Sequence, residues 1–287
     1  MGIVLGPTQY GKAECRLVRI VRDTQRHEIR DLNVSTALRG DFAAAHISGD
    51  QSRVLPTDTQ KNTVYAFAKS HGVGEPEEFG LLLGRHFVAG TESVESARIA
   101  IEEFGWDRIG EHDHSFVRRG QEVRTAVVTV SGSDEWVVSG LADLVVLKST
   151  GSEFAGFLVD EYTTLPETRD RVLATALTVQ WRYAHIEVDW APAYDDVRRL
   201  LLRAFAETHS FALQQSLYAM GSAVLEARPE IVEVRLVAPN KHHFAVDLAP
   251  FGLDNPGEIF HAADRPYGLI EATVTRDDAP DPGPAWL

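Results

Sequence analysis

The feature that most constrains the fold of this chain is an order of segment types that occurs twice. Alternating apolar and polar residues rich in β-branched side chains predict strands, and amphipathic runs predict helices. In the first half the expected order is strand 13–22, strand 27–34, helix 61–71, helix 76–90, strand 95–104 and strand 122–132. The second half repeats this order with strands 135–150 and 171–190, helices 192–210 and 213–230, and strands 231–240 and 268–276. The two blocks meet near residues 131–135, which predicts a first unit over residues 1–132 and a second over residues 133–287.

A duplicated strand–strand–helix–helix–strand–strand unit predicts an α+β protein in which each antiparallel sheet carries helices on one face. A sheet of this kind has open edges that must be covered or paired. We therefore expect an oligomer in which sheets of neighbouring subunits pair. The last segment, residues 277–287, is rich in Pro and Asp, and we expect it to be frayed.

Composition excludes several classes of protein. The chain has 42 acidic and 28 basic residues among 287, and its net charge of −14 repels nucleic acids and anionic membranes. Its single cysteine, Cys15, can form no disulfide within the chain, and we find neither an apolar run long enough to span a membrane nor a signal peptide. We therefore expect a soluble cytoplasmic protein. If its substrate is a small anion, the site needs an Arg or Lys of its own.

The N-terminal stretch VLGPTQYGKAE, residues 4–14, raises a specific question about Lys12. Its spacing Gly6-x-x-x-x-Gly11-Lys12 matches a phosphate-binding loop up to the last position, where Ala13 replaces the Ser or Thr that such a loop uses for Mg²⁺. Too few residues precede Gly6 to form a central strand, and the residues after Lys12 alternate as a strand does rather than forming the required helix. A nucleotide loop is therefore rejected. From this stretch alone, Lys12 is a solvated lysine at a strand start.

Three polar clusters are further candidates. His112-Asp113-His114 has the His-x-His spacing of a metal site but no third ligand nearby, so a solvated loop is the favoured interpretation. Asn240, His242 and His243 stand at a strand end, where functional groups often gather; the alternative is a loop histidine hydrogen-bonded to backbone. Thr57 and Asp58 open a helix, where they either cap its free N–H groups or leave those groups to grip a ligand.

Seven segments together resemble the urate oxidase (uricase) family, in the family's order and over nearly the whole chain. They are YGKAE (10–14), TDTQKNTVYAFA (57–68), LKSTGSEFAGF (147–157), EYTTLPETRDR (161–171), FAETHSFALQQ (205–215), PNKHHF (239–244) and ADRPYGLIEATV (263–274). The resemblance implies a tunnelling fold, in which two ββααββ units per chain assemble as a homotetramer around a β-barrel tunnel. It implies an enzyme of purine degradation that oxidises urate with O₂ and water to 5-hydroxyisourate and H₂O₂, with no cofactor and no metal.

The resemblance also implies the site, position by position. Urate would stack on Phe154, Arg171 and Gln214 would grip its edge, and the backbone N–H of Leu213 and the backbone of Asp58 would assist. Thr57 and Asn240 would hold dioxygen or water above the ring, and Lys12 with Thr57 would form a proton relay that His242 orients. Lys12, Thr57 and Asp58 would come from one subunit and the rest from its neighbour. Only the family pattern selects His242 over His243.

Two other functions stay open. Related enzymes of the same fold act on pterins and similar rings, some of them with zinc, and would need Cys and His ligands that this sequence does not convincingly supply. A non-catalytic purine-binding or scaffolding protein would be favoured by a broken relay, but Lys12, Thr57 and His242 are all present.

Overall fold

The computed structural model describes residues 2–287. By their internal contacts these form two compact units. The first unit comprises Met1–Gly140, Arg182–Tyr194 and Pro280–Leu287, and the second comprises Leu141–Trp181 and Asp195–Ala279.

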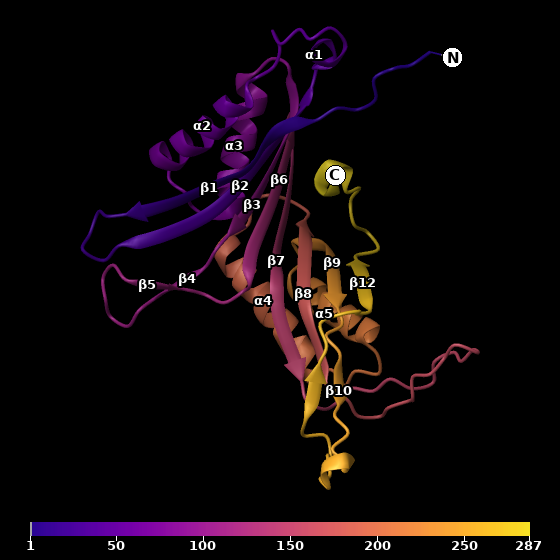
Figure 1. Cartoon of the computed structure of the whole chain (residues 1–287). Helices are drawn as coiled ribbons and strands as arrows, with labels where there is room; N and C mark the ends of the chain where they lie inside the picture. Colours follow the sequence, from indigo (N-terminus) through magenta and orange to yellow (C-terminus); the bar gives the residue numbers. More distant parts are fainter. Residues whose placement is uncertain (1) are drawn as a thin grey trace. The chain divides into compact units, whose positions relative to one another are not determined.

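The first unit is built on antiparallel strands in the order β1-β2-β3-β6 (Figure 1). Their bounds are Tyr10–Val21 for β1, Glu28–Gly40 for β2, Val94–Glu103 for β3 and Val123–Ser131 for β6. The unit also contains helices α1 (Ala43–Ile47), α2 (Thr57–Ser70) and α3 (Pro76–Gly90), and a small ladder of β4 (Trp106–Arg108) with β5 (Phe116–Arg118). Strand β1 is an edge strand.

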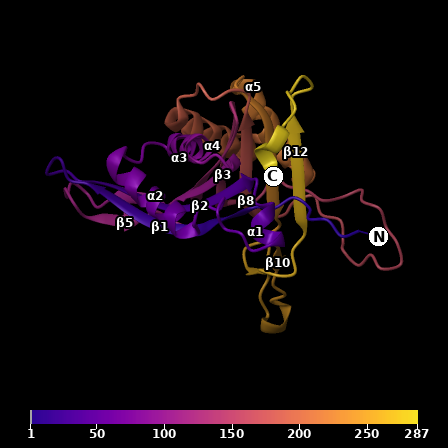
Figure 2. The ribbon, with the colours of Figure 1, turned by 90° about the horizontal axis from the view of Figure 1, so that it is seen from above.

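Helices α2 and α3 cover one face of these strands, as Figures 1 and 2 show. Two glycines let α3 approach the sheet closely: a Cβ added at Gly80 would lie 2.6 Å from a methyl of Val128, and one at Gly84 2.7 Å from a methyl of Val130. The buried core between the layers includes Leu32, Val34, Leu38, Val64, Phe79, Leu83, Phe87 and Ile99.

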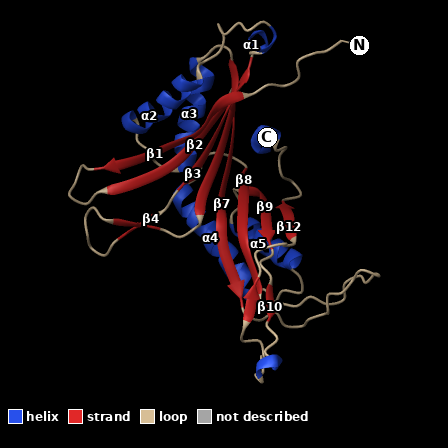
Figure 3. Cartoon of the chain, viewed as in Figure 1, coloured by secondary structure: helices blue, strands red, loops and turns tan. Residues whose placement is uncertain are grey.

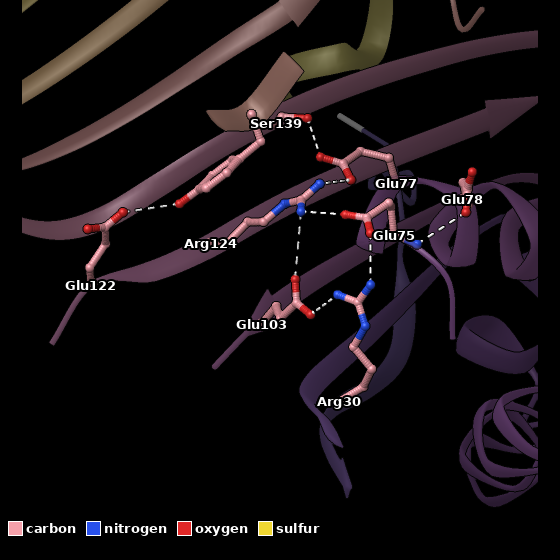
Figure 4. Close-up of polar contacts among 9 residues, drawn as sticks. Arg30, Glu75, Glu77, Glu78, Glu103, Glu122, Arg124 and Ser139 are labelled. Carbon is pink, nitrogen blue, oxygen red and sulfur yellow. Dashed lines mark hydrogen bonds and ion pairs between the residues drawn. The ribbon is translucent and has the colours of Figure 1, made fainter. Parts of the chain in front are cut away.

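An ion-pair network fixes the start of α3 to the sheet (Figure 4). Arg124 on β6 bonds Glu75 over 2.5 Å and the fully buried Glu77 over 2.8 Å, and Arg30 on β2 bonds Glu75 over 2.8 Å. Ser139 donates to the other oxygen of Glu77 over 2.5 Å. These bonds satisfy the buried carboxylate, which would be very costly without partners.

The second unit contains its own strands and helices. Strands β7 (Asp134–Lys148) and β8 (Leu173–Tyr183) contribute residues to both units, and β9 (Ile231–Pro239) pairs antiparallel with β12 (Leu269–Thr275). Helix α5 (Leu213–Ala227) packs on β9 and β12, and it is preceded by α4 (Trp190–Glu207), which belongs to the second unit from Asp195 onward. The unit is completed by the short strands β10 (His243–Ala245) and β11 (Phe260–Ala262) and the 3₁₀ turn η1 (Ala249–Phe251). Figure 3 shows the long loop that joins β7 to β8.

The predicted order strand–strand–helix–helix–strand–strand is present twice, and the sheets are antiparallel. The boundary at residues 132 and 133 stays a prediction. Three predictions were wrong in extent: the strand expected over 27–34 continues to Gly40, the helix expected from Lys61 begins at Thr57, and the strand expected over 171–190 ends at Tyr183.

The prediction of a frayed C-terminus was also wrong. Residues Gly283–Trp286 form the turn η2, and Ala285 is buried. Trp286 and Ala285 pack against Val127 and Val138 of the first unit. The Pro- and Asp-rich composition of residues 277–287 predicted disorder, but Ala285 and Trp286 near the end of this segment pack against apolar side chains of the sheet.

Candidate active site

Lys12 lies on β1 beside an irregularity in the strand. The pairing of β1 with β2 shifts register between Lys12 and Cys15, and Glu14 adopts a φ of 55°. A bulge of this kind bends a strand and re-aims neighbouring side chains. The predicted strand after Lys12 is confirmed. Among residues 2–287 the ammonium group of Lys12 has no hydrogen-bond or ion-pair partner.

Two buried side chains connect Lys12 to the start of α2. The backbone N–H of Lys12 donates to the hydroxyl of Thr36 over 3.1 Å, and that hydroxyl donates to Gln60 Oε1 over 2.7 Å. The amide of Gln60 donates in turn to the carbonyl of Leu55 over 3.3 Å. Gln60 is 0% exposed and Thr36 is 4% exposed. Strand β1 and the first turn of α2 are therefore held together by bonds that water does not reach.

The start of α2 carries Thr57 and Asp58. We considered that one of them caps the helix, and this interpretation was wrong: the N-cap residue is Pro56, and no side chain caps the helix. The Asp58 carboxylate instead accepts from the side chains of Lys61, over 2.5 Å, and Asn62, over 2.9 Å. Lys61 lowers the pKa of Asp58 most, and the charge of Lys12 lowers it further, so Lys12 lies within electrostatic reach of this helix start. The first N–H groups of α2 are left available to a ligand.

Phe154 and Arg171 lie close together in the loop between β7 and β8. The guanidinium carbon of Arg171 lies 5.3 Å from the centre of the Phe154 ring. Phe154 is held by an antiparallel bridge to Thr168, and the backbone N–H of Arg171 donates to Ser152 O over 2.9 Å. The Nε of Arg171 donates to the buried hydroxyl of Ser152 over 3.2 Å. Burial lowers the pKa of Arg171, which has no carboxylate partner among the described residues.

The start of α5 is connected by hydrogen bonds to the segment that contains Phe154. Leu213 is the first residue of the helix and Gln214 the second, and no side chain caps the helix. The segment before α5 is bonded to the Phe154 segment, because Glu153 N–H donates to Ser210 O over 2.7 Å and Ser210 N–H donates to Gly151 O over 2.9 Å. The hydroxyl of Ser216 on α5 donates to that of Ser210 over 2.8 Å. Gln214 is exposed. The free N–H groups in the first turn of α5 and the side chain of Arg171 are therefore held by the same hydrogen-bonded segment around Ser152.

Asn240 and His242 follow β9. Asn240 forms a bridge with Thr175 near the start of β8, and the N–H of Lys241 donates to Ala174 O over 2.8 Å. The two histidines differ. Nδ1 of His243 is hydrogen-bonded to the carbonyl of Lys241 over 2.9 Å, whereas the ring of His242 stacks at 5.6 Å on Phe244 and has no hydrogen-bond partner among residues 2–287. His243 is therefore bonded to backbone, although it is the first residue of strand β10 rather than a loop residue.

The candidate residues form two groups. Lys12, Thr57 and Asp58 belong to the first unit, and the second unit contains Phe154, Arg171, Leu213, Gln214, Asn240 and His242. Sequence reasoning missed Thr36, Gln60 and Ser152. Nothing in their local patterns distinguishes them from ordinary strand and helix positions, and only their burial with satisfied hydrogen bonds identifies them.

The remaining candidates do not form a site of their own. His112, Asp113 and His114 lie in the connection between β4 and β5, where the carbonyl of Asp113 accepts from His27 N–H and from Arg108. Within residues 2–287, no group of three potential metal ligands is close enough to hold an ion. None of the described helices is both long and apolar enough to cross a membrane.

Comparison with known proteins identifies the family. The model of the family described as Uricase matches residues 8–129 and 137–271. A uricase of Arthrobacter globiformis is 59% identical over 99% of this chain and 94% of its own length, and a uricase of Dictyostelium discoideum is 37% identical over 93% and 96%.

Solved structures agree with this. The crystal structure of the Arthrobacter globiformis uricase superposes with a TM-score of 0.97, covering 100% of this chain and 99% of that one. A urate oxidase of Bacillus sp. TB-90, 24% identical, shares the fold with a TM-score of 0.83 over 94% of this chain and 100% of its own. The chain belongs to the uricase family, whose function is the oxidation of urate.

Proposed function

We propose that this protein is a cofactor-independent urate oxidase that converts urate, O₂ and water to 5-hydroxyisourate and H₂O₂. The observation that carries the proposal is the pairing of Arg171 with Phe154, whose guanidinium and ring lie 5.3 Å apart beside the uncapped start of α5. A purine ring can stack on the aromatic face while a planar guanidinium donates to its carbonyl edge. The molecule is acidic overall, so this cation supplies the local charge that an anionic ligand requires.

In the proposed complex, Arg171 and the side-chain amide of Gln214 grip the edge of urate, with the N–H of Leu213 next to them. Charge-assisted bonds from a guanidinium are strong and fix the orientation of a planar anion. Asp58 adds its backbone N–H, which lies in the uncapped first turn of α2. Asn240 and Thr57 hold O₂ or water above the ring.

The reaction proceeds by removal of a proton and then of electrons. Lys12 accepts a proton through the Thr57 hydroxyl, and His242 orients this relay. The resulting urate dianion is electron-rich and gives two electrons to O₂, which takes up the proton held by Lys12 and one proton from the attacking water and leaves as H₂O₂. Water adds its oxygen to the oxidised ring and gives 5-hydroxyisourate. Lys12 has a side chain free of partners in the described structure, which suits a group that must gain and lose a proton.

The active site is proposed to be shared between subunits. In a homotetramer of the tunnelling fold, Lys12, Thr57 and Asp58 of one copy would face the second-unit candidate residues, among them Phe154 and Arg171, of a neighbouring copy. The paired sheets of the subunits would close a β-barrel. The edge strands β1 and β12 support this, since an exposed edge has backbone groups free to pair. Its single cysteine, Cys15, is unpaired and suits a reducing compartment, and the cytoplasm is the location we propose.

The test is to follow urate by its ultraviolet absorbance in air with a metal chelator present, while an electrode measures O₂ and a coupled assay measures H₂O₂. We expect urate and O₂ to disappear in a 1:1 ratio and H₂O₂ to form in the same amount. Loss of activity with the chelator, restored by added metal, would overturn the cofactor-independent reaction. Persistence of urate under all conditions would overturn the function itself.

A further inference from the structure

Ser152, in the loop between β7 and β8, is a buried residue that contacts Arg171 at two points. Its side chain is 0% exposed. The backbone N–H of Arg171 donates to the carbonyl of Ser152 over 2.9 Å, and Nε of Arg171 donates to the Ser152 hydroxyl over 3.2 Å. One short side chain and its own backbone therefore hold both the main chain and the guanidinium of Arg171.

Hydrogen bonds on both sides of Ser152 fix its own position. Ser152 forms a parallel bridge with Ser210, which is also 0% exposed. Ser210 N–H donates to Gly151 O over 2.9 Å, and Glu153 N–H donates to Ser210 O over 2.7 Å. Ser210 lies just before α5, and its hydroxyl accepts from Ser216 on that helix over 2.8 Å. Ser152 is therefore anchored to the segment from which α5 begins.

The bond to Ser152 determines which edge of the Arg171 guanidinium is free. A guanidinium has five N–H donors in one plane. Ser152 accepts from Nε, and in the part of the chain that the structure describes the terminal nitrogens Nη1 and Nη2 have no hydrogen-bond or ion-pair partner. Two parallel N–H groups at the end of the side chain therefore remain free, and such a fork suits two adjacent acceptors of a planar anion.

The acceptor that Ser152 offers is a neutral oxygen. A carboxylate in its place would also orient the guanidinium, but it would compensate the charge of Arg171 and compete with an anionic ligand. A hydroxyl accepts the hydrogen bond and leaves that charge in place. Arg171 is partly buried, which lowers its pKa, but a guanidinium stays charged in proteins. The cation is therefore oriented and partly shielded from water while its whole charge remains available to a ligand.

We propose that Ser152 is a positioning residue for substrate binding, which sets the plane of the Arg171 guanidinium and fixes it relative to Gln214 at the start of α5. The inference rests on the proposed function, in which Arg171 and Gln214 grip urate. A flexible side chain that its ligand has to order costs free energy on binding. Because Ser152 orders Arg171 before urate arrives, its hydroxyl contributes to affinity without contacting the substrate.

The first experiment measures the binding of urate itself by calorimetry in the absence of O₂, so that no turnover occurs. We expect Ser152→Ala to bind urate about 3- to 10-fold more weakly than the wild type, the effect of losing one typical hydrogen bond. In air, KM should rise by a similar factor and kcat should change less. Ser93→Ala is the matched control and should bind urate as the wild type does, since it removes a buried serine hydroxyl that donates to Arg53 O over 2.6 Å in the first unit.

A double-mutant cycle separates an effect through Arg171 from general damage to the loop. In the Arg171→Met background, Ser152→Ala should change the affinity for urate less than about twofold, because the group that Ser152 orients is gone. The same 3- to 10-fold loss in both backgrounds would overturn the proposal, and so would an unchanged affinity in Ser152→Ala alone. If Arg171→Met alone binds urate as the wild type does, the proposed grip on the substrate fails together with this inference.

The second experiment does not depend on a variant that folds. A crystal structure of the wild type with urate, prepared without O₂, should show Nε of Arg171 still bonded to the Ser152 hydroxyl while Nη1 and Nη2 donate to urate. A complex in which Nε of Arg171 has left Ser152 and donates to urate would overturn the positioning role and leave the proposed function intact. A complex in which Arg171 does not touch urate would overturn both.

Discussion

The hydroxyl of Thr36 donates a hydrogen bond to Gln60 Oε1 over 2.7 Å, and both side chains are buried. The same hydroxyl accepts from the backbone N–H of Lys12 over 3.1 Å. One oxygen atom therefore sets the position of β1 at Lys12 relative to the helix that begins with Thr57. Because proton transfer requires donor and acceptor within hydrogen-bond reach, a small displacement here would be costly to a Lys12–Thr57 relay.

Thr36→Val tests this positioning role. The substitution keeps the shape of the side chain but leaves Gln60 Oε1 and the Lys12 N–H without partners. We expect a loss of about 1–3 kcal/mol in the free energy of unfolding, measured by urea denaturation. We also expect a lower kcat with little change in the affinity for a urate analogue. Thr63→Val is the control, since the Thr63 hydroxyl bonds only a carbonyl of its own helix; an equal loss of kcat in both variants would contradict the positioning role.

Lys12→Met tests the proposed base. The substitution removes the amine but keeps most of the side-chain volume, and positioned acid–base groups contribute about 10²–10⁴-fold to rate. We expect kcat to fall by about that factor while the dissociation constant of a urate analogue, measured by calorimetry, changes little. Lys69→Met, in the last turn of α2, should behave as the wild type. Turnover close to wild type in Lys12→Met would show that another group takes the proton.

Arg171→Met tests the proposed grip on the substrate. Hydrogen bonds to charged groups contribute about 1.5–3 kcal/mol, so we expect the analogue to bind about 10- to 150-fold more weakly. The matched control is Arg169→Met in the same loop, because the Arg169 side chain is 80% exposed and its contact with Glu153 is 3.5 Å long. If the two variants bind the analogue equally well, Arg171 does not hold the substrate.

The Glu75 network predicts how stability depends on pH. Burial alone would raise the pKa of Glu75, but the bonds and charges of Arg30 and Arg124 outweigh it and lower the pKa below its usual value of 4.5. The unfolded chain therefore binds more protons in acid, and the stability that Glu75 contributes is present above pH 4.5 and lost as the pH falls through the lowered pKa.

Glu75→Gln should flatten this part of the curve of unfolding free energy against pH. The control is Glu111→Gln, whose side chain is 98% exposed and lies 3.9 Å from Arg26. An acid limb of unchanged slope in Glu75→Gln would contradict the network's contribution.

Much of the fold could be predicted from the sequence because local periodicity and tertiary packing agree. Helix α3 begins at Pro76 and ends at Gly90 as expected, since Pro at the first turn, Glu77 and Glu78 favour a helix start. The strand after Lys12 was predictable from alternation alone. The C-terminal turn was not, because the burial of Ala285 depends on a distant sheet surface.

The candidate site, unlike the fold, could be predicted only in part from the sequence. Family resemblance selected Phe154 and Arg171, and the structure places them together. Residues that hold the site, such as Gln60 and Ser152, have no sequence signal, because a buried Gln or Ser has the same appearance in a sequence as an exposed one. A capping role for Thr57 or Asp58 was one of two interpretations of this helix start, but Pro56 takes the capping position.

We propose that Lys12 and Arg171 act on the same urate molecule from neighbouring subunits. Lys12→Met and Arg171→Met subunits, co-expressed with different affinity tags, can be purified as mixed oligomers and assayed for urate and O₂ consumption. A mixed oligomer of wild-type and doubly substituted subunits is the control that shows such assemblies can turn over. A shared site predicts clear activity in the mixed oligomer of the two inactive variants, because some sites then combine an intact Lys12 with an intact Arg171. A mixed oligomer as inactive as its parents, beside an active control, would contradict the claim.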